Sequence, residues 1–314
     1  MAQEPKEVTP SLILTNFSLA HRNLDVIWRA VMPIIQVPKR QGFYWEQNKA
    51  DNFTLIDDSL SPNAAVNENG TVFSKKPYAV ESKGTGDWIS QEELDEEDGI
   101  NILTTQTEVN NDLLELRQDK RVADLVFASA NYPTANKVVL SGVNQWSDTT
   151  SNPIKEISTG MLAMLARGNL LVFGAETWEA FRRHPQILDA VKASTRNQGA
   201  AGGLASDSEI GALFTTNPQD PVRVVVGQSK YTTDSGATFT RVWGKHCAII
   251  RTTANPTRRS QIFGATISQN LRSTGTFFDG TRGESGSTLV KTTWNRTEII
   301  MAADVGYFIE NAVA

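Results

Sequence analysis

The stretch Asn169–Lys192, NLLVFGAETWEAFRRHPQILDAVK, places a short apolar run directly before a helical pattern. The run at 170–173 has the length and continuity of a buried strand, and Gly174 closes it. Large apolar side chains then recur at a roughly helical spacing that Pro185 interrupts: Trp178, Phe181 and Leu188. The stretch therefore predicts a buried strand that turns at once into a helix. It carries no catalytic constellation, so it indicates architecture rather than chemistry.

The chain has room for one large core or two moderate ones, because it has 314 residues and domains usually hold about 100–200. Hydrophobic residues make up 39% and charged residues 21%, which predicts a folded chain with extended loops. The net charge of -5 gives no overall attraction for a phosphate backbone and argues against a dedicated nucleic-acid binder. Arg182–Arg183 and Arg258–Arg259 are candidates for local contact with DNA, with a solvated surface pair as the simpler interpretation.

Cys247 is the only cysteine, which excludes an intrachain disulfide and the usual cysteine-based zinc sites. The N-terminal segment lacks the basic and apolar regions of a signal peptide. No apolar run approaches the roughly 18 residues of a membrane span. The sequence therefore predicts a soluble, cytosolic product with no membrane partner.

The motifs of common enzymes are incomplete. Residues 283–287, GESGS, have serine where the second glycine of G-x-S-x-G belongs. The histidines, His21, His184 and His246, provide no His-x-x-x-His pair for zinc. His246 and Cys247 are neighbours on an expected strand, so their side chains point to opposite faces and cannot easily form a nucleophile pair. We predict structural roles for His184 and Cys247, and we expect no catalytic residue, metal or cofactor.

The first 50 or so residues predict an arm with apolar anchor points. A polar tail leads into residues 24–37, where Pro33 and Pro38 forbid a long helix. The anchors Trp28, Ile34 and Ile35 could be buried against a neighbouring subunit or, equally, on the core of the same chain.

Residues 48–88 are rich in polar side chains and contain short alternating apolar patches, which suits a long two-stranded excursion. Such a hairpin is marginal alone in water and needs a surface to lie on. Its candidate contact residues are Phe53, Phe73 and Tyr78. A mobile surface loop is the alternative interpretation.

Residues 101–129 carry the longest helical pattern. Its apolar positions recur at three- and four-residue steps: Ile102, Val109, Leu113, Leu116, Ala123 and Phe127. The pattern assigns the outer, solvent-facing side to Asp112, Glu115, Gln118 and Asp119. Just before it, Ser90 and Glu93 have capping-box spacing and predict a short helix start. A coiled-coil dimer is disfavoured because the apolar seam is impure.

The remaining segments predict alternating strands and helices. A strand at 137–140 precedes a helix that starts at Asn152-Pro153, and a short helix at 208–214 precedes a strand at 222–226. A second sheet region is expected from strands at 239–243 and 247–251. Further strands are expected at the end of the chain: 288–294, 298–302 and 306–309.

The order of these segments resembles the major capsid proteins of tailed double-stranded DNA bacteriophages, the family with the HK97-type fold. The resemblance rests on the arm with Phe43-Tyr44-Trp45, the excursion, the long helix, the stretch 169–192 and Val242-Trp243-Gly244-Lys245. The closing residues 303–311, ADVGYFIEN, are similar to the family's common ending.

The resemblance implies an α+β (mixed α/β) fold with five parts. They are an N-terminal arm (1–47), an E-loop (48–88), a peripheral domain with the spine helix (89–152), an axial domain (approximately 153–285) and C-terminal strands returning to the peripheral domain (286–314). It also implies that the E-loop lies across a neighbouring subunit and that the arm embraces another.

The resemblance further implies a non-enzymatic coat protein that assembles through hexamers and pentamers into an icosahedral shell around phage DNA. The expected location is the virion, after assembly in the host cytoplasm. Expected partners are other copies of the chain, a separate scaffolding protein, a portal protein, packaged DNA through weak nonspecific contacts and, as an option, a decoration protein. A scaffold is expected because the arm begins within a few dozen residues of Met1.

Two alternatives stay open. A cellular encapsulin-type compartment would share the fold and hold a cargo enzyme in place of DNA. A soluble α/β hydrolase would require a pocket that joins His184 or His246 to Ser, Asp or Glu.

Overall fold

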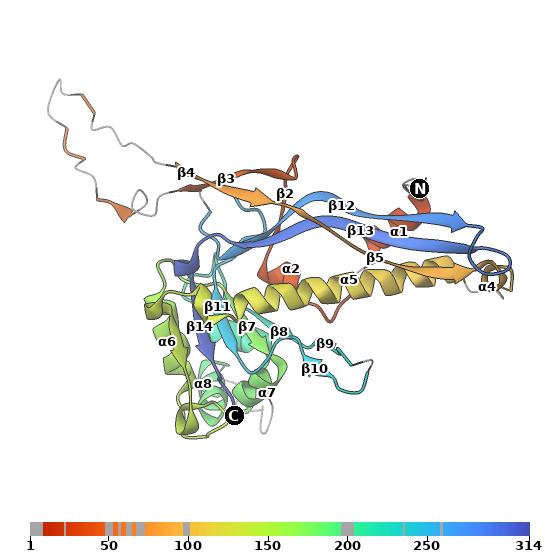
Figure 1. Cartoon of the computed structure of the whole chain (residues 1–314). Coiled ribbons are helices and arrows are strands. Elements are labelled where there is room, and N and C mark those ends of the chain that lie inside the picture. The colour runs from red at the N-terminus through yellow and green to blue at the C-terminus, as the bar shows by residue number, and fades with distance from the viewer. Residues whose placement is uncertain are drawn as a thin grey trace.

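The computed structural model describes residues 9–21, 23–47, 53–55, 58–60, 65–66, 73–96, 101–195, 204–234, 236–257 and 260–314. In Figure 1 a long antiparallel sheet lies over a single long helix, and a compact unit of mixed sheet and short helices lies below one end of that helix. A two-stranded ribbon projects from the same end of the long sheet. Arg258–Arg259, named above as a candidate for local contact with DNA, lie outside the described residues.

The long sheet joins segments from both ends of the chain. Its strand order is β1-β12-β13-β5, and β2 pairs in parallel beside β12. The strands are β1 (Thr9–Pro10), β2 (Ile34–Gln36), β5 (Glu81–Ser90), β12 (Gly264–Asp279) and β13 (Ser287–Ile300). The strands predicted at 288–294 and 298–302 form one continuous strand, β13. The sequence analysis assigned no strand to the residues of β12.

The predicted long helix is confirmed as α5 (Ile102–Val126), 25 residues that span about 37 Å. Asn101 caps it by accepting a hydrogen bond from the backbone N–H of Thr104 at 2.9 Å. The predicted orientation of this helix is wrong. Its buried stripe is largely polar and includes Glu115, Gln118 and Asp119, whereas Val109 and Leu113 are 44% and 49% exposed. The buried polar side chains Glu115 and Asp119 form ion pairs and hydrogen bonds inside the subunit.

The compact unit is built on a second five-stranded sheet with the order β6-β14-β11-β7-β8. Its strands are β6 (Lys137–Val139), β7 (Leu170–Gly174), β8 (Arg223–Gly227), β11 (Cys247–Ile250) and β14 (Gly306–Glu310). The predicted separate sheet region is wrong, because β11 pairs directly with β7 and β14. The closing strand also differs from the expectation: β13 lies in the long sheet, but β14 lies between β6 and β11.

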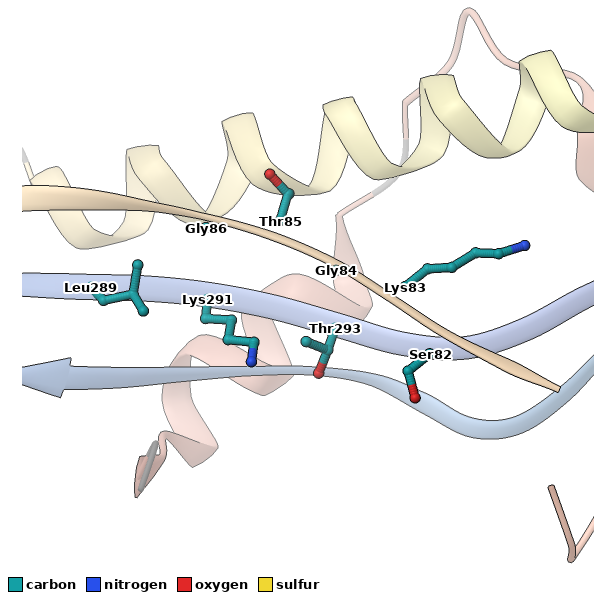
Figure 2. A pocket seen from close by; sticks show the side chains of 8 residues that line it. All are labelled: Ser82, Lys83, Gly84, Thr85, Gly86, Leu289, Lys291 and Thr293. Carbon is teal, nitrogen blue, oxygen red and sulfur yellow. The ribbon is translucent and has the colours of Figure 1, made fainter. Parts of the chain in front are cut away.

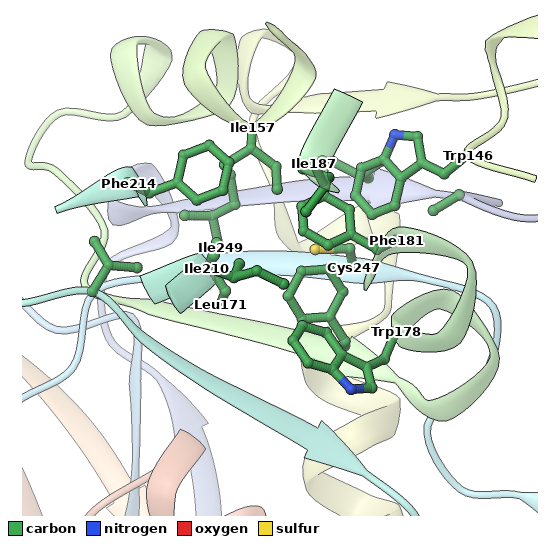
Figure 3. Packing of buried hydrophobic residues seen from close by; sticks show 14 of the residues in the cluster. Trp146, Ile157, Leu171, Trp178, Phe181, Ile187, Ile210, Phe214, Cys247 and Ile249 are labelled. Atoms are coloured by element: carbon green, nitrogen blue, oxygen red, sulfur yellow. The ribbon is translucent and has the colours of Figure 1, made fainter. Parts of the chain in front are cut away.

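The stretch that opened the analysis forms the centre of this unit. All five residues of β7 are buried, and the chain enters α7 (Ala175–Arg183) directly. Pro185 then begins a second helix, α8 (Pro185–Thr195). With α6 (Pro153–Ala163) and α9 (Asp207–Phe214), these helices cover an aromatic core in which Trp146, Trp178 and Phe181 meet (Figure 3).

The other described elements are short. They are α1 (Leu12–Ala20), α2 (Trp28–Val31), β3 (Gln41–Gln47), β4 (Phe73–Ala79), α4 (Gln91–Asp95), β9 (Lys230–Tyr231) and β10 (Thr240–Arg241). Single 3-10 turns lie at Ser129–Asn131, Thr134–Asn136, Gly142–Asn144 and Ala303–Val305. The capping box predicted at Ser90 is present, with Glu93 accepting from the Ser90 N–H at 2.9 Å.

Candidate assembly surfaces

The projecting ribbon consists of β3 and β4, paired antiparallel from Gln41 opposite Ala79 to Gln47 opposite Phe73. Among the described residues this pair forms a sheet of its own, separate from the long sheet. Its base is closed by a 2.7 Å hydrogen bond from the Val80 N–H to the Arg40 carbonyl. The strand pairing thus begins seven residues before the predicted excursion, and β5 continues from it into the long sheet.

Apolar side chains of the ribbon lie open to solvent. Phe43 is 64% exposed, and it borders a surface cleft of about 500 Å³ with Pro77 and Tyr78. Further along, Phe53 is 53% exposed and Leu55 is 98% exposed. A two-stranded ribbon gains little stability by itself, so these groups represent apolar surface that the described part of the chain does not cover.

The six predicted contact residues have different environments. Trp28 is fully buried inside its own chain, where its ring meets Trp294 edge-on at 6.5 Å, so it offers no surface to a neighbour. Ile34 and Ile35 are half-buried in β2, beside β12. Phe53 is exposed and Tyr78 is half-buried. The backbone of Phe73 lies in β4 opposite Gln47, and its side chain lies outside the described part.

The sequence analysis missed the helix α1. Ser11 caps it by accepting from the Leu14 N–H at 3.3 Å. Its inner side buries Leu14 and Ser18, and the Ser18 hydroxyl donates to Asn111 of α5 at 2.8 Å. Its outer side leaves Leu12 and Ile13 about 80% exposed (80% and 81%). The signal that could have found it was the serine cap followed by a nine-residue run without proline or glycine.

The carboxylate of Asp119 joins α5 to three separated segments of the chain. One carboxylate oxygen accepts from the backbone N–H groups of Ile27 and Trp28, at 3.1 and 3.0 Å. The other accepts from the Ser229 hydroxyl at 2.6 Å and from the Trp243 indole N–H at 2.8 Å. Burial raises the pKa of Asp119, and the four donated hydrogen bonds oppose that rise. Asp119 therefore takes the place of an N-cap for α2 and holds Trp243 under α5.

Glu115, one turn away, fixes the arm in the same manner. Its Oε1 accepts from Arg29 at 2.7 Å and from Arg272 of β12 at 2.9 Å, and its Oε2 accepts from the Asn23 N–H at 3.3 Å. Arg272 also donates to the Ser18 and His21 carbonyls, at the end of α1. Arg272 is buried, and so its ion pair with Glu115 is shielded from salt. These contacts dock the described residues between Ser18 and Arg29 on their own chain.

We expect Asp119→Ala to destabilise the subunit by about 3–5 kcal/mol, because four buried donors would lose their acceptor. Urea unfolding of the soluble subunit would measure the change. Asp124→Ala on the same helix is the matched control: its ion pair with Lys120 is exposed, so the loss should stay below about 0.5 kcal/mol. Equal midpoints for Asp119→Ala and wild type would contradict the assigned role of this carboxylate.

His184 and Cys247, which were considered above as possible catalytic residues, are both buried. His184 is buried, with its Nε2 3.2 Å from both the Ser151 hydroxyl and the Asp148 carbonyl. Cys247 is fully buried in β11, and burial raises the pKa of its thiol well above the usual value. Within the described ranges, no three His, Cys, Asp or Glu side chains gather as a metal site requires. Of the helices described, none is both long and apolar enough to cross a bilayer.

The chain is similar to curated phage proteins along its whole length. It is 29% identical over 319 residues to the major capsid protein of Pseudomonas phage JBD67, and the match covers 100% of both chains. It is 24% identical over 303 residues to the major capsid protein of Burkholderia phage BcepMu, covering 95% of this chain and 94% of the relative. No family model matches the sequence.

Solved structures share the fold. A phage-related protein from Bordetella bronchiseptica RB50 superposes with a TM-score of 0.76 at 18% identity, covering 98% of this chain and 99% of the other. The capsid of cyanophage P-SCSP1u gives 0.57 at 7% identity, covering 99% and 91%. An encapsulin complex from Synechococcus elongatus gives 0.52 at 10% identity, covering 99% and 92%. By sequence this chain is similar to phage major capsid proteins, and its fold matches solved phage capsid structures of the HK97-like type.

Proposed function

We propose that this chain is the major capsid protein of a tailed double-stranded DNA phage and forms an icosahedral shell through hexamers and pentamers. The observation that carries the proposal is the end-to-end match to the major capsid protein of phage JBD67, together with the shared fold. The exposed apolar groups of the ribbon and of α1 support it, because a shell subunit must cover such groups with its neighbours.

The parts of the subunit follow from this assignment. The β3–β4 ribbon with residues 48–72 is the E-loop, and α5 with the long sheet is the peripheral domain. The compact unit around β7 and β11 is the axial domain, which surrounds the symmetry axes of the capsomers. Here β14 belongs with the axial sheet, so the C-terminal segment contributes to both domains.

The proposed role is structural and not catalytic. The named relatives are coat proteins, and His184 and Cys247 have roles in packing. Further proposed partners are a separate scaffolding protein, a portal protein, packaged DNA held by weak nonspecific contacts and a decoration protein. Many weak contacts per subunit suit such assembly, because misplaced copies can leave while the closed shell stays stable.

An encapsulin-type compartment remains the second candidate, because a solved encapsulin complex shares the fold. The contents of the particle distinguish the two functions. We expect the chain, expressed with the other structural genes of its phage, to yield closed shells with nuclease-protected double-stranded DNA, as seen by negative-stain microscopy. Shells with a cargo enzyme and no DNA would favour the encapsulin function. A chain that stays monomeric under these conditions would overturn both.

A further inference from the structure

We propose that the subunit holds a small inorganic anion of the size of chloride in a buried site between α2, β12 and β13. The ligands are N–H groups of two arginines, Arg272 and Arg296, and of two indoles, Trp28 and Trp294. The ion would tie α2 to the long sheet. This site belongs to the single subunit, so the inference is independent of the proposed shell function.

Strand β13 sends one row of its side chains into the interior. Trp294 and Arg296 belong to this row and are 1% and 4% exposed. Glu298, of the same row, forms an ion pair with Arg121 of α5 at 3.4 Å. Lys291, of the alternate row, lines a hollow on the other face of the sheet (Figure 2). The Arg296 guanidinium therefore lies between the sheet and the helices, where arginine is rare unless it is paired.

An irregularity in β12 and the helix α2 add further donors. Between Asn270 and Ser273 the register of β12 against β13 shifts, as in a β-bulge. Arg272 lies within this irregularity and is 3% exposed. Trp28 of α2 is fully buried, and its ring meets that of Trp294. Three separated segments thus contribute to one buried cluster.

The side chains of the cluster lie against one another. The guanidinium carbon of Arg296 is 4.0 Å from the ring centroid of Trp294 and 5.2 Å from that of Trp28. The guanidinium carbon of Arg272 is 6.0 Å from the Trp294 ring, and that of Arg29 is 4.8 Å from the Trp28 ring. A ring face attracts a cation, but it does not replace an acceptor for each N–H group.

The cluster has an excess of hydrogen-bond donors. Six buried nitrogens have no acceptor in the described part of the chain: Nε and Nη1 of Arg296, Nε of Arg272, Nε of Arg29, and Nε1 of Trp28 and of Trp294. All six are donors. Buried polar groups are nearly always paired, so this group of donors indicates a shared acceptor.

The charges of the cluster are unbalanced in the same direction. Glu115 accepts from both Arg29 and Arg272, so one carboxylate faces three guanidinium groups. Glu298 has two other cationic partners. Burial, followed by the charges of Arg29 and Arg272, lowers the pKa of Arg296 to about 9, which leaves this group a cation at neutral pH. An anion supplies both the missing acceptor and the missing charge.

The arrangement of the donors favours a monatomic ion. Carboxylates and phosphates are typically held by the planar fork of one guanidinium. Here the unpaired N–H groups come from side chains of α2, β12 and β13, and a spherical ion accepts hydrogen bonds from any direction. Arg29 borders the cluster and 36% of its side chain is exposed, which gives the side from which an ion enters.

A chloride titration of the full-length subunit tests the site. Urea unfolding is measured while chloride replaces gluconate at constant total salt. We expect each tenfold rise in chloride above its dissociation constant to raise the folding equilibrium constant about tenfold, because the ion binds the folded state. Arg296→Met should abolish this dependence. In gluconate alone it should be at least as stable as wild type, because it removes an unpaired buried charge.

Arg282→Met is the matched control. Arg282 also lies over a tryptophan ring, 4.0 Å from the centroid of Trp88, but it is exposed and far from the cluster in the sheet. This variant should respond to chloride as wild type does. Chloride NMR adds a measurement that needs no variant: folded wild type should broaden the chloride signal, and the urea-unfolded chain should not.

The outcomes separate the claims. Wild-type stability that does not depend on chloride would overturn the site and leave water as the partner of these donors. An unchanged chloride line width would overturn it even if Arg296→Met fails to fold. A chloride response of equal size in folded Arg296→Met and in wild type would overturn the assignment of these ligands. None of these results depends on whether the subunit forms shells.

Discussion

Gly174→Ala is expected to leave no folded subunit, whereas Gly244→Ala, on the opposing segment, should fold normally. Gly174 ends β7 and precedes the first residue of α7, so it forms the turn from strand to helix. A Cβ at this position would lie 1.7 Å from the Gly244 carbonyl oxygen and 2.7 Å from that of Trp243. Ordinary contact requires about 3.5 Å, and both obstacles are backbone atoms that cannot rotate away.

The expected cost of Gly174→Ala exceeds about 5 kcal/mol, which is comparable to the whole stability of many domains. To remove the overlap between the new Cβ and the two carbonyl oxygens, β7 would have to move away from the segment that carries Trp243. This movement would also disturb the hydrogen bond from the Trp243 indole to Asp119. A Cβ at Gly244 meets only the His246 ring, at 3.5 Å. The measurement is the soluble fraction after expression, followed by circular dichroism. Soluble Gly174→Ala with a wild-type melting temperature would contradict the close packing of these two segments.

Removal of the ribbon is expected to abolish shells while leaving the subunit folded. The variant replaces residues 41–79 with two glycines, so that Arg40 and Val80 keep their 2.7 Å backbone hydrogen bond. The core should survive, because the ribbon forms its own sheet and both main clusters of buried residues lie elsewhere. Assembly should fail, because each subunit would lose its longest extension and the apolar groups on it.

Two measurements check this second prediction. Thermal unfolding and size-exclusion chromatography should show a folded subunit with a melting temperature close to that of wild type. Electron microscopy of the same preparation should show no closed shells. Phe43→Ser within an intact ribbon is the graded control, and it should lower the yield of shells without eliminating them. Shells of normal form from the excised variant would refute the role given to the ribbon.

The sequence predicted well those elements that local signals define. The strand and helix at 169–192 follow from a continuous apolar run and a helical spacing, and the start of α6 follows from Asn152 and Pro153. The Ser90 capping box and the structural role of Cys247 were also recognisable. In each case a few neighbouring residues contain the necessary information.

The sequence could not reveal features that depend on distant partners. The inward side of α5 is set by Arg29, Arg272 and Trp243, which lie far from it in the chain and satisfy Glu115 and Asp119. The assumption that polar side chains face solvent therefore assigned the buried face of α5 to the solvent side. Pairing of β11 with β7 depends on register and not on local pattern.

The same limit applies to the candidate contact residues. Large apolar residues in the arm and in the excursion looked alike in sequence, but Trp28 is buried by its own chain through contacts with Trp294 and α5, whereas Phe53 of the excursion remains exposed.

Cryo-electron microscopy of the assembled particle, at a resolution that separates side chains, tests the central claim that sister copies cover the extended parts of this subunit. The account predicts that the β3–β4 ribbon of each subunit lies against a neighbouring subunit, with Phe53 and Leu55 buried in the contact. A ribbon that folds back on its own subunit, or that remains solvated in a closed shell, would contradict it.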